Sequence, residues 1–379
     1  MDFTYSEEQE LLRNSVARFL ADNYSFETFK KVSRGELGWR PECWKQFAEL
    51  GLLGAAIPEA YGGLGGGAVE TMIVMEAFGR ALVVEPYVPS VVVAGGFLRS
   101  GGSEAQKQEW LARIAGGDAI VAFAFAEPQG RYNLADLSTT AGKRGPAYVL
   151  NGRKSVAIGA PLAEALIVTA RTGGGRRDEK GVSVFLVDKR AKGVATRDYP
   201  TLDGLRASEI TFENVEVPAD RLVGMADDGL ALVEQIVDEA IAAHCAEAHG
   251  AMKALLESTV EYSKTRKQFG IAIGKFQVLQ HRMVDMFMQV EQSASMTLMV
   301  TLKLGENAVV RKKAASAGKV QAGNAGRFVG QGAVQIHGGM GMTDELAVGH
   351  YFKRLTMIDT LYGNVDHHLK RYAALSSPP

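Results

Sequence analysis

The feature that most restricts the fold is a change in the spacing of apolar residues along the chain. From about Asp228 onward they recur at helical spacing, which predicts long helices over 228–266, 276–304, 308–336 and 344–374. Between Asp118 and Asp228 the pattern changes to short runs rich in β-branched and aromatic residues, separated by glycine, asparagine and proline. The chain is therefore expected to contain a sheet domain followed by a bundle of long helices.

Helix signals also fill the segment before Asp118. Ser6 to Gln9 and Ser103 to Gln106 read as capping boxes, and Pro41 is placed as a first-turn proline. Another helix is predicted over 69–82. The glycine-rich run 62–67 formally matches a weakened dinucleotide fingerprint, but no strand precedes it, so we interpret it as a flexible link between helices.

The middle segment contains short candidate strands without helices between them, which predicts an antiparallel sheet or barrel. The candidates are 120–126, 148–150, 165–171, 182–187, 195–198 and 209–212. The predicted fold class is α+β, mostly α. It has an N-terminal helical domain over 1–118, a β-barrel-like domain over 119–225, and a C-terminal four-helix bundle over 226–379.

Charge and cysteine content exclude several classes of function. The formal net charge is −1, so no overall field favours nucleic acid or an anionic membrane. Cys43 and Cys245 are too few for a disulfide framework or a metal cluster, which suggests a reducing compartment. The N-terminus lacks the basic residues of a signal peptide, and no apolar run is long enough to span a bilayer. We therefore expect a cytoplasmic protein without a metal.

The break between the first two long C-terminal helices is rich in hydrogen-bond donors. Gly270 and Gly274 bracket a turn, and around it the chain places Arg266, Lys267, Gln268 and Gln277. Cations and amides on a rigid connector suit a diphosphate or a carboxylate. Basic residues near the end of a helix are also favoured by the helix dipole alone, so this stretch by itself leaves both readings open.

A stripe of small residues marks the third long helix. Ala314, Gly318, Ala322, Gly326 and Gly330 recur every fourth residue, which permits close packing of a partner helix. Charged residues on the same helix exclude a membrane span. The stripe is therefore expected to be a contact within a helix bundle or between subunits, and we take it to predict assembly.

Two motifs resemble the C-terminal signature of acyl-CoA dehydrogenases. They are Tyr262-x-x-x-Arg266-x-Gln268-Phe269-Gly270, continuing through Phe276-Gln277, and Gln335-Ile-His-Gly338-Gly339-Met-Gly341. The resemblance covers nearly the whole chain and implies FAD as cofactor, with the two segments coming from neighbouring subunits to hold the adenosine diphosphate. It implies these cofactor-binding residues: Arg266, Gln268, Phe269, Phe276, Gln277, Gln335, Gly338, Gly339 and Asn364.

The resemblance also implies a reaction and its partners. An acyl-CoA is oxidised to the 2,3-enoyl-CoA as a base removes the α-proton and the β-hydrogen leaves as hydride to flavin N5. Electron-transfer flavoprotein is the expected acceptor, and a tetramer the expected assembly. A buried glutamate suits the base, because burial raises the pKa of its carboxyl toward neutrality.

The sequence departs from the family pattern at the base. Where relatives often have a glutamate before a glycine near the C-terminus, this chain has Tyr362, and a phenol with a pKa of about 10 is a poor base at neutral pH. A second family location falls on Ala240. Glu239 adjoins that position and is our first candidate, while Glu247 lies two helical turns along the same face and is our second. Asp238 is a distant third.

The surroundings expected for the flavin ring depart as well. Ala126 replaces a threonine, and 156–158 reads Val-Ala-Ile where relatives have Trp-Ile-Thr. The run from Val237 to Leu361 is similar to small subunits of heteromeric acyl-CoA dehydrogenases such as pimeloyl-CoA dehydrogenase, which hints at a dicarboxylyl or bulky acyl group.

These departures leave three readings of the function. The chain is an acyl-CoA dehydrogenase with a relocated base, or a base-less flavin-binding scaffold subunit of a heterotetramer. A flavin monooxygenase or nitroalkane oxidase on the same fold is a third.

Overall fold

The computed structural model describes residues 4–376, and contacts between residues divide it into two compact units. The first unit comprises residues up to Lys31, Ala68–Val83 and the chain from Ile241 onward; the second comprises Val32–Gly67 and Val84–Ala240. Within residues 4–376, no helix is long and apolar enough to cross a membrane, and no cluster of His, Cys, Asp or Glu could hold a metal ion.

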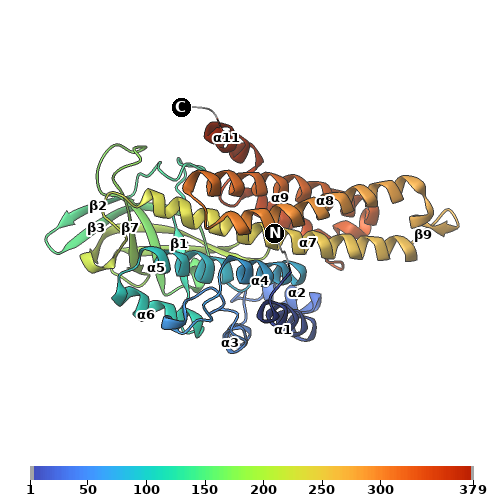
Figure 1. The fold of residues 1–379 in the computed structure, drawn as a ribbon, viewed down its shortest axis with the longest axis horizontal. Coiled ribbons are helices and arrows are strands. Elements are labelled where there is room, and N and C mark those ends of the chain that lie inside the picture. Colours follow the sequence, from blue (N-terminus) through green and yellow to red (C-terminus); the bar gives the residue numbers. More distant parts are fainter. Residues whose placement is uncertain (1–3, 377–379) are drawn as a thin grey trace. The chain divides into compact units, whose positions relative to one another are not determined.

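The first unit is built from helices (Figure 1). Its elements are α1 (Glu7–Asn23), α4 (Ala68–Ala81), most of α7 (Leu230–Thr265), α8 (Gln277–Lys303), α9 (Ala308–His337), α10 (Val348–Thr360) and α11 (Val365–Ser376), with the hairpin β9 (Lys267–Gln268) and β10 (Ile271–Ala272) and the 3-10 turns η5 (Ile273–Lys275) and η6 (Gly338–Met342). The capping box at Ser6 is present as predicted. Helix α9 packs against α8, α10 and α11, so it is the centre of this bundle.

The predicted fourth long helix is divided in two. The chain leaves helical geometry at Leu361, and Tyr362 and Gly363 have positive φ angles of 57° and 116°. A residue with a side chain is strained in the left-handed region. The turn at Tyr362 is therefore imposed by the surrounding fold and is not an ordinary helix end. The four-helix arrangement therefore closes with two shorter helices, α10 and α11.

The small-residue stripe lies against helices of the same chain. A Cβ atom on Gly318 would lie 2.2 Å from Val300 on α8, and one on Gly330 would lie 2.8 Å from Phe352 on α10. Gly326 faces Leu355, also on α10, at 3.4 Å. Packing inside the bundle explains these positions of the stripe, which confirms the reading as a contact within a helix bundle. Assembly stays a prediction that the stripe by itself does not carry.

Helices α4 and α7 cross with their backbones in contact, a close approach that two glycines allow. A Cβ on Gly79 would lie 2.0 Å from the carbonyl oxygen of Glu247, and one on Gly250 would lie 1.9 Å from that of Glu76. Gly250→Ala is therefore expected to lower the free energy of unfolding by about 1–3 kcal/mol, because overpacking outweighs the better helix propensity of alanine. Chemical denaturation measures the change.

Gly305→Ala is the matched control, since nothing lies within 4 Å of a Cβ at that position. Equal stability of the two variants would contradict the close crossing of α4 and α7.

The second unit combines short helices with a sheet. Its elements are α3 (Pro41–Glu49), η1 (Glu59–Tyr61), the π-helix η2 (Val88–Ala94), α5 (Gly95–Gly101), α6 (Glu104–Ala115), β1 (Val121–Ala124), β2 (Thr140–Arg144), β3 (Ala147–Ile158), η3 (Ala160–Leu162), β4 (Ala165–Arg171), β5 (Val182–Asp188), β6 (Val194–Pro200), β7 (Arg206–Pro218), η4 (Ala219–Arg221) and β8 (Leu222–Val223). Helix α2 (Phe26–Arg34) crosses the boundary between the units. The capping box at Ser103 and the first-turn Pro41 are present as predicted.

Within residues 4–376 the main sheet has eight strands, ordered β6-β7-β3-β2-β4-β5-β8, with β1 paired to β4. Most pairs are antiparallel, as predicted, but β4 has two parallel neighbours: β1, with Val121 opposite Ala165, and β2, with Thr140 opposite Arg171. Parallel neighbours need a long connection, and the β2–β3 hairpin lies within the connection from β1 to β4. Strands β3 and β7 pair over most of their length, with register shifts between Leu150 and Gly152 and between Lys154 and Ala157.

The glycine-rich run 62–67 contains one tightly packed position, Gly63, while residues 62 and 64–66 are exposed. A Cβ on Gly63 would lie 1.9 Å from the carbonyl oxygen of Ile57, and a Cβ on Gly54 would lie 3.2 Å from the Cα atom of Gly63. The amide of Gly63 also donates to the carbonyl of Pro58. Gly63 therefore allows a close backbone approach that a side chain would prevent.

Candidate functional site

The β9–β10 hairpin lies at the far end of α7 and α8 (Figure 1). Four donors on the hairpin, on its flanks and near the end of α9 have no partner in the described residues. Arg266, Gln268, Gln277 and Gln335 are all exposed, and none of their side chains forms a hydrogen bond within residues 4–376. One guanidinium and three amides without partners fit a ligand that supplies acceptors, such as a diphosphate.

Phe269 is an unusual surface residue on this hairpin. Its side chain is 92% exposed and its φ angle is +52°. The ring is held at 6.1 Å from the ring of Phe276 in an edge-to-face arrangement. A bulky exposed aromatic in a strained conformation is favourable only when something covers it, so this tip has the character of a contact surface.

The two signature motifs meet within one chain. The ring of Tyr262 stacks on that of His337 at 4.2 Å, and the Tyr262 hydroxyl donates to the His337 carbonyl at 3.4 Å. Arg266 follows Tyr262 by one helical turn, and Gly338 follows His337 directly. Gly338 has φ 59° and ψ −139°, which favour glycine, and a Cβ on Gly338 or Gly339 would meet nothing within 4 Å. This open backbone fits close approach of a ligand.

The turn that carries Tyr362 is fixed by polar contacts. Lys319 on α9, fully buried, donates to the carbonyl oxygens of Asp359 at 2.9 Å and Gly363 at 2.5 Å. His368 donates to the Tyr362 carbonyl at 3.1 Å, and the Asn364 side chain caps α11 by accepting from the amide of His367. Asn364, predicted to bind the cofactor, therefore has a role in the turn itself.

Burial shifts the pKa values of the ionisable groups in and around this turn. Burial raises the pKa of the Tyr362 phenol further above its ordinary value. Burial, with the nearby Lys319 cation, lowers the pKa of His368 to about 3. Burial also lowers the pKa of Lys319 to about 8. No residue of this turn supplies a carboxylate where relatives carry a glutamate.

Glu247 is part of a buried ion pair. Arg354 on α10 donates from Nε to Oε1 at 2.6 Å and from Nη2 to Oε2 at 2.8 Å, and His244 donates to Oε2 at 2.9 Å. Burial opposes the charge, but Arg354 and His244 outweigh it and lower the pKa of Glu247 to about 2. A carboxylate held this way has little proton affinity.

Glu239 is also engaged, although less completely. Arg99 on α5 donates to Oε2 at 2.6 Å, and Gln235 donates to Oε1 at 3.4 Å. The Glu239 side chain is 17% exposed, compared with 6% for Glu247. Asp238, the third candidate, is buried. Glu239 is therefore held less tightly than Glu247.

The segments expected near the flavin ring lie together in the second unit. The amide of Ser155 donates to the Ala126 carbonyl at 2.8 Å, and Val156 follows with a φ angle of +51° and 45% exposure. Beneath them, Lys154 and Glu127 form a buried ion pair at 2.7 Å. The Glu-Pro and lysine motifs are therefore structural supports for this edge.

Comparison with known proteins decides the family. Residues 6–118, 122–215 and 227–374 match the acyl-CoA dehydrogenase N-terminal, middle and C-terminal domains in turn. The "Probable acyl-CoA dehydrogenase YngJ" of Bacillus subtilis is 31% identical, and the match covers 92% of each chain. This chain belongs to the acyl-CoA dehydrogenase family.

Acyl-CoA dehydrogenases are oxidoreductases that depend on flavin, and solved structures of relatives agree with the fold described above. The ChsE4–ChsE5 complex from Mycobacterium tuberculosis gives a TM-score of 0.90 at 27% identity, covering 100% of both chains. The FAD complex of PigA gives a TM-score of 0.91 at 27% identity, covering 99% of this chain and 98% of that one. The predicted acyl-CoA dehydrogenase-like fold is confirmed.

Sequence reasoning missed the residues that restrain this acyl-CoA dehydrogenase site. Arg354 and Lys319 were not singled out, although Lys319 stands directly beside Gly318 in a stripe of small residues. A lysine in such a closely packed stripe needs a buried hydrogen-bond acceptor. Its position could therefore have indicated a structural role from the sequence. Arg354 had no such signal, because its partner Glu247 lies more than a hundred positions earlier.

Proposed function

We propose that this chain binds FAD and acts as the flavin-binding subunit of an acyl-CoA dehydrogenase in which another chain removes the α-proton. One observation carries the proposal: each carboxylate considered as a base on α7 is ion-paired or buried, and Tyr362 occupies the glutamate position. The substrate class is an acyl-CoA, and the product is the 2,3-enoyl-CoA.

Flavin binding is supported by the exposed donors of the first unit. Arg266 and Gln268 would contact the diphosphate, and Gln335 with the Gly338–Gly339 backbone would support the adenosine part. Phe269, Phe276 and Gln277 complete the proposed contact surface. When bound, FAD would accept the β-hydrogen of the substrate as hydride. The residues of this chain would only hold the cofactor in position.

The proton affinities of Glu247 and Tyr362 support the proposal that another chain carries the base. General-base catalysis is most effective when the pKa of the base lies near the working pH. Glu247 has a pKa of about 2, far too low, and burial raises the pKa of Tyr362 so that its phenolate does not form near neutrality. A second chain that carries the glutamate would supply the missing step.

Assembly is supported by exposed apolar side chains on the first unit. Val284, Phe287 and Met288 share one face of α8 and are each about half exposed, and Phe269 lies at the end of the same helix pair. Such a surface fits a heterotetramer with a second acyl-CoA dehydrogenase-like chain, or a homotetramer. The ChsE4–ChsE5 complex is a relative made of two named chains. Electron-transfer flavoprotein is the proposed acceptor.

Substrate recognition by Arg206 is not supported. Its guanidinium donates to the carbonyl oxygens of Ser33 at 3.2 Å and Gly35 at 2.6 Å. A dicarboxylyl substrate would need another cation, and Arg131 is exposed. We therefore restrict the proposal to an acyl-CoA.

A chain that is catalytic by itself remains the second candidate, because Glu239 is less tightly held than Glu247. Glu239→Gln separates the two. Under the main proposal Glu239 is structural, so the wild type and the variant both leave the flavin oxidised when acyl-CoA is added, and the variant loses stability because Arg99 is left without its counter-charge. Stopped-flow absorbance measures the rate of flavin reduction.

A fall of about 10²- to 10⁴-fold in Glu239→Gln, with FAD still bound, would contradict the proposal and identify Glu239 as the base. Glu234→Gln is the matched control, since Glu234 lies on the same helix outside the candidate positions.

A further inference from the structure

Strand β3 contains a bulge opposite Glu209 of β7. Between two successive pairs of the β3–β7 ladder, β3 has two residues, Ser155 and Val156, where β7 has only Glu209. The extra residue in a bulge bends its strand and re-aims a side chain, and bulges are frequent beside functional sites. The bulge is therefore a place where the sheet can present a side chain to a ligand.

Val156 is strained at this bulge. Its φ angle is +51°, and its side chain is 45% exposed. A β-branched residue is a genuine outlier in the left-handed region, which glycine and asparagine occupy with less strain. Such a conformation persists only where the surrounding structure imposes it, and it is common at sites that clamp a ligand.

The carboxylate of Glu209 holds the bulge in this conformation. It accepts hydrogen bonds from the Ser155 hydroxyl and the Val156 amide, and the Tyr199 hydroxyl on β6 donates to Oε1 at 3.1 Å. Arg153 donates to Oε2 at 3.2 Å. Burial opposes the charge of Glu209, whose side chain is 15% exposed, but these hydrogen bonds outweigh burial and lower the pKa of its carboxyl. One charged group therefore joins the bulge to both β6 and β7.

The bulge is also joined to the segment around Ala126. The amide of Ser155 donates to the Ala126 carbonyl at 2.8 Å. Lys154, which precedes the bulge, is fully buried and forms its ion pair with Glu127 at 2.7 Å. The backbone on both strands of this edge is thus fixed, while the apolar side chain of Val156 stays accessible.

We propose that Glu209 is a positioning residue for the flavin ring, which it serves by holding Val156 as an exposed apolar contact. The inference rests on the proposed binding of FAD and extends it. The exposed donors of the first unit suit the diphosphate, whereas the ring of a flavin is flat and needs a mainly apolar surface. Val156 offers such a surface at the edge where the ring is expected. Glu209 acts only through Val156.

Val156→Gly separates binding of the ring from stability. Relief of strain offsets the greater freedom of glycine in the unfolded chain, so thermal unfolding of the apoprotein should occur close to the wild-type temperature. FAD, titrated by quenching of its fluorescence, should bind about tenfold more weakly because an apolar contact is lost. The visible circular dichroism of bound flavin should fall as well. Calorimetry with ADP, which lacks the ring, should give the wild-type affinity.

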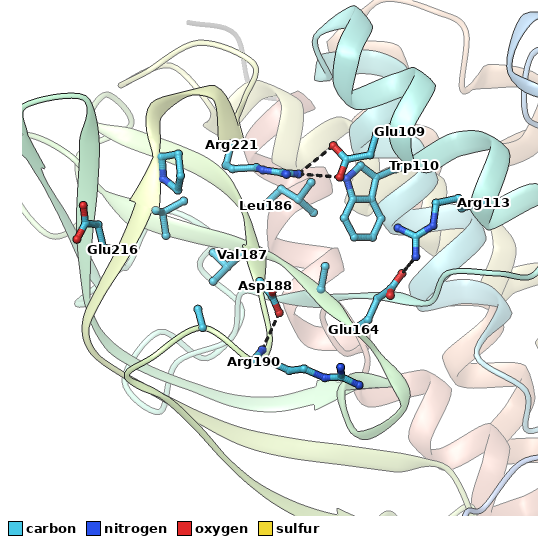
Figure 2. Close-up of a pocket in the computed structure, with 14 residues that line it drawn as sticks. Glu109, Trp110, Arg113, Glu164, Leu186, Val187, Asp188, Arg190, Glu216 and Arg221 are labelled. Atoms are coloured by element: carbon cyan, nitrogen blue, oxygen red, sulfur yellow. Dashed lines mark hydrogen bonds and ion pairs between the residues drawn. The ribbon is translucent and has the colours of Figure 1, made fainter.

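Glu209→Gln removes the charge at constant size and should weaken FAD binding by about two- to tenfold, again without an effect on ADP. Because Glu209 acts through Val156, the double variant should bind FAD no more weakly than Val156→Gly alone. Glu216→Gln is the matched control. Glu216 is an exposed carboxylate on the same strand, at a pocket of about 430 Å³ (Figure 2), and it makes no hydrogen bond or ion pair among residues 4–376. This control should bind FAD as the wild type does.

The possible failures are distinguishable. Wild-type protein that takes up no FAD would overturn both the proposed function and this inference. If the wild type binds FAD and Val156→Gly binds it equally well, with unchanged circular dichroism, only the inference fails. Additive losses in the double variant, or an equal weakening of ADP, would also overturn the inference and leave FAD binding in place.

Discussion

Replacing Glu247 by glutamine is expected to lower the free energy of unfolding by about 3–5 kcal/mol. The substitution leaves the Arg354 guanidinium buried without a counter-charge, and an uncompensated buried charge is among the most costly single changes. His244 loses its charged acceptor at the same time. Urea denaturation monitored by circular dichroism measures the effect.

The double variant Glu247→Gln with Arg354→Met is the control. It removes both charges together, so most of the lost stability should return. A catalytic role for Glu247 predicts the opposite pattern, with Glu247→Gln as stable as the wild type and only turnover lost. Unchanged stability in Glu247→Gln would therefore contradict the ion-pair assignment.

The same pair gives the protein a defined response to acid. Because the pKa of Glu247 is depressed to about 2 in the folded state, the pair stabilises the fold above the ordinary carboxyl pKa. That contribution is lost as pH falls from the ordinary carboxyl range toward 2. The Glu247→Gln, Arg354→Met variant should lack this component, and a parallel loss in both proteins over that range would contradict it.

Arg266→Ala is expected to weaken FAD binding by roughly 10- to 150-fold. The exposed Arg266 guanidinium has no partner within residues 4–376, and a hydrogen bond to a charged group contributes about 1.5–3 kcal/mol. Quenching of flavin fluorescence on titration of apoprotein measures the dissociation constant.

Lys275→Ala is the matched control, because Lys275 is an exposed cation on the same connector outside the signature positions. It should bind FAD as the wild type does. Equal weakening in both variants would indicate a general charge effect and would remove the specific role proposed for Arg266.

Much of the fold was predictable because its signals are local. Capping boxes at Ser6 and Ser103 mark two helix starts, and the β4 strand occupies the predicted range 165–171. Helices α2 and α5 and strand β2 were not predicted. Glycines at both ends of α5 and in β2 weaken the local pattern, and tertiary packing outweighs it there.

The restraint of the candidate bases was not predictable from local pattern. The sequence places Glu239 and Glu247 on one helix, but their partners Arg99 and Arg354 lie on other helices, far away along the chain. The stripe around Gly318 shows the same limit, since spacing reveals that a helix packs closely but not against what. Pairing between distant positions depends on the fold as a whole.

Anaerobic titration of the purified, FAD-loaded chain with acyl-CoA thioesters tests the central claim most directly. The visible absorbance of the oxidised flavin reports the redox state of the cofactor over a panel of straight, branched and dicarboxylyl substrates. If the base belongs to another chain, the flavin of this chain alone stays oxidised with every thioester, while dithionite still reduces it. Bleaching of the flavin by any acyl-CoA in the absence of a second chain would contradict the account.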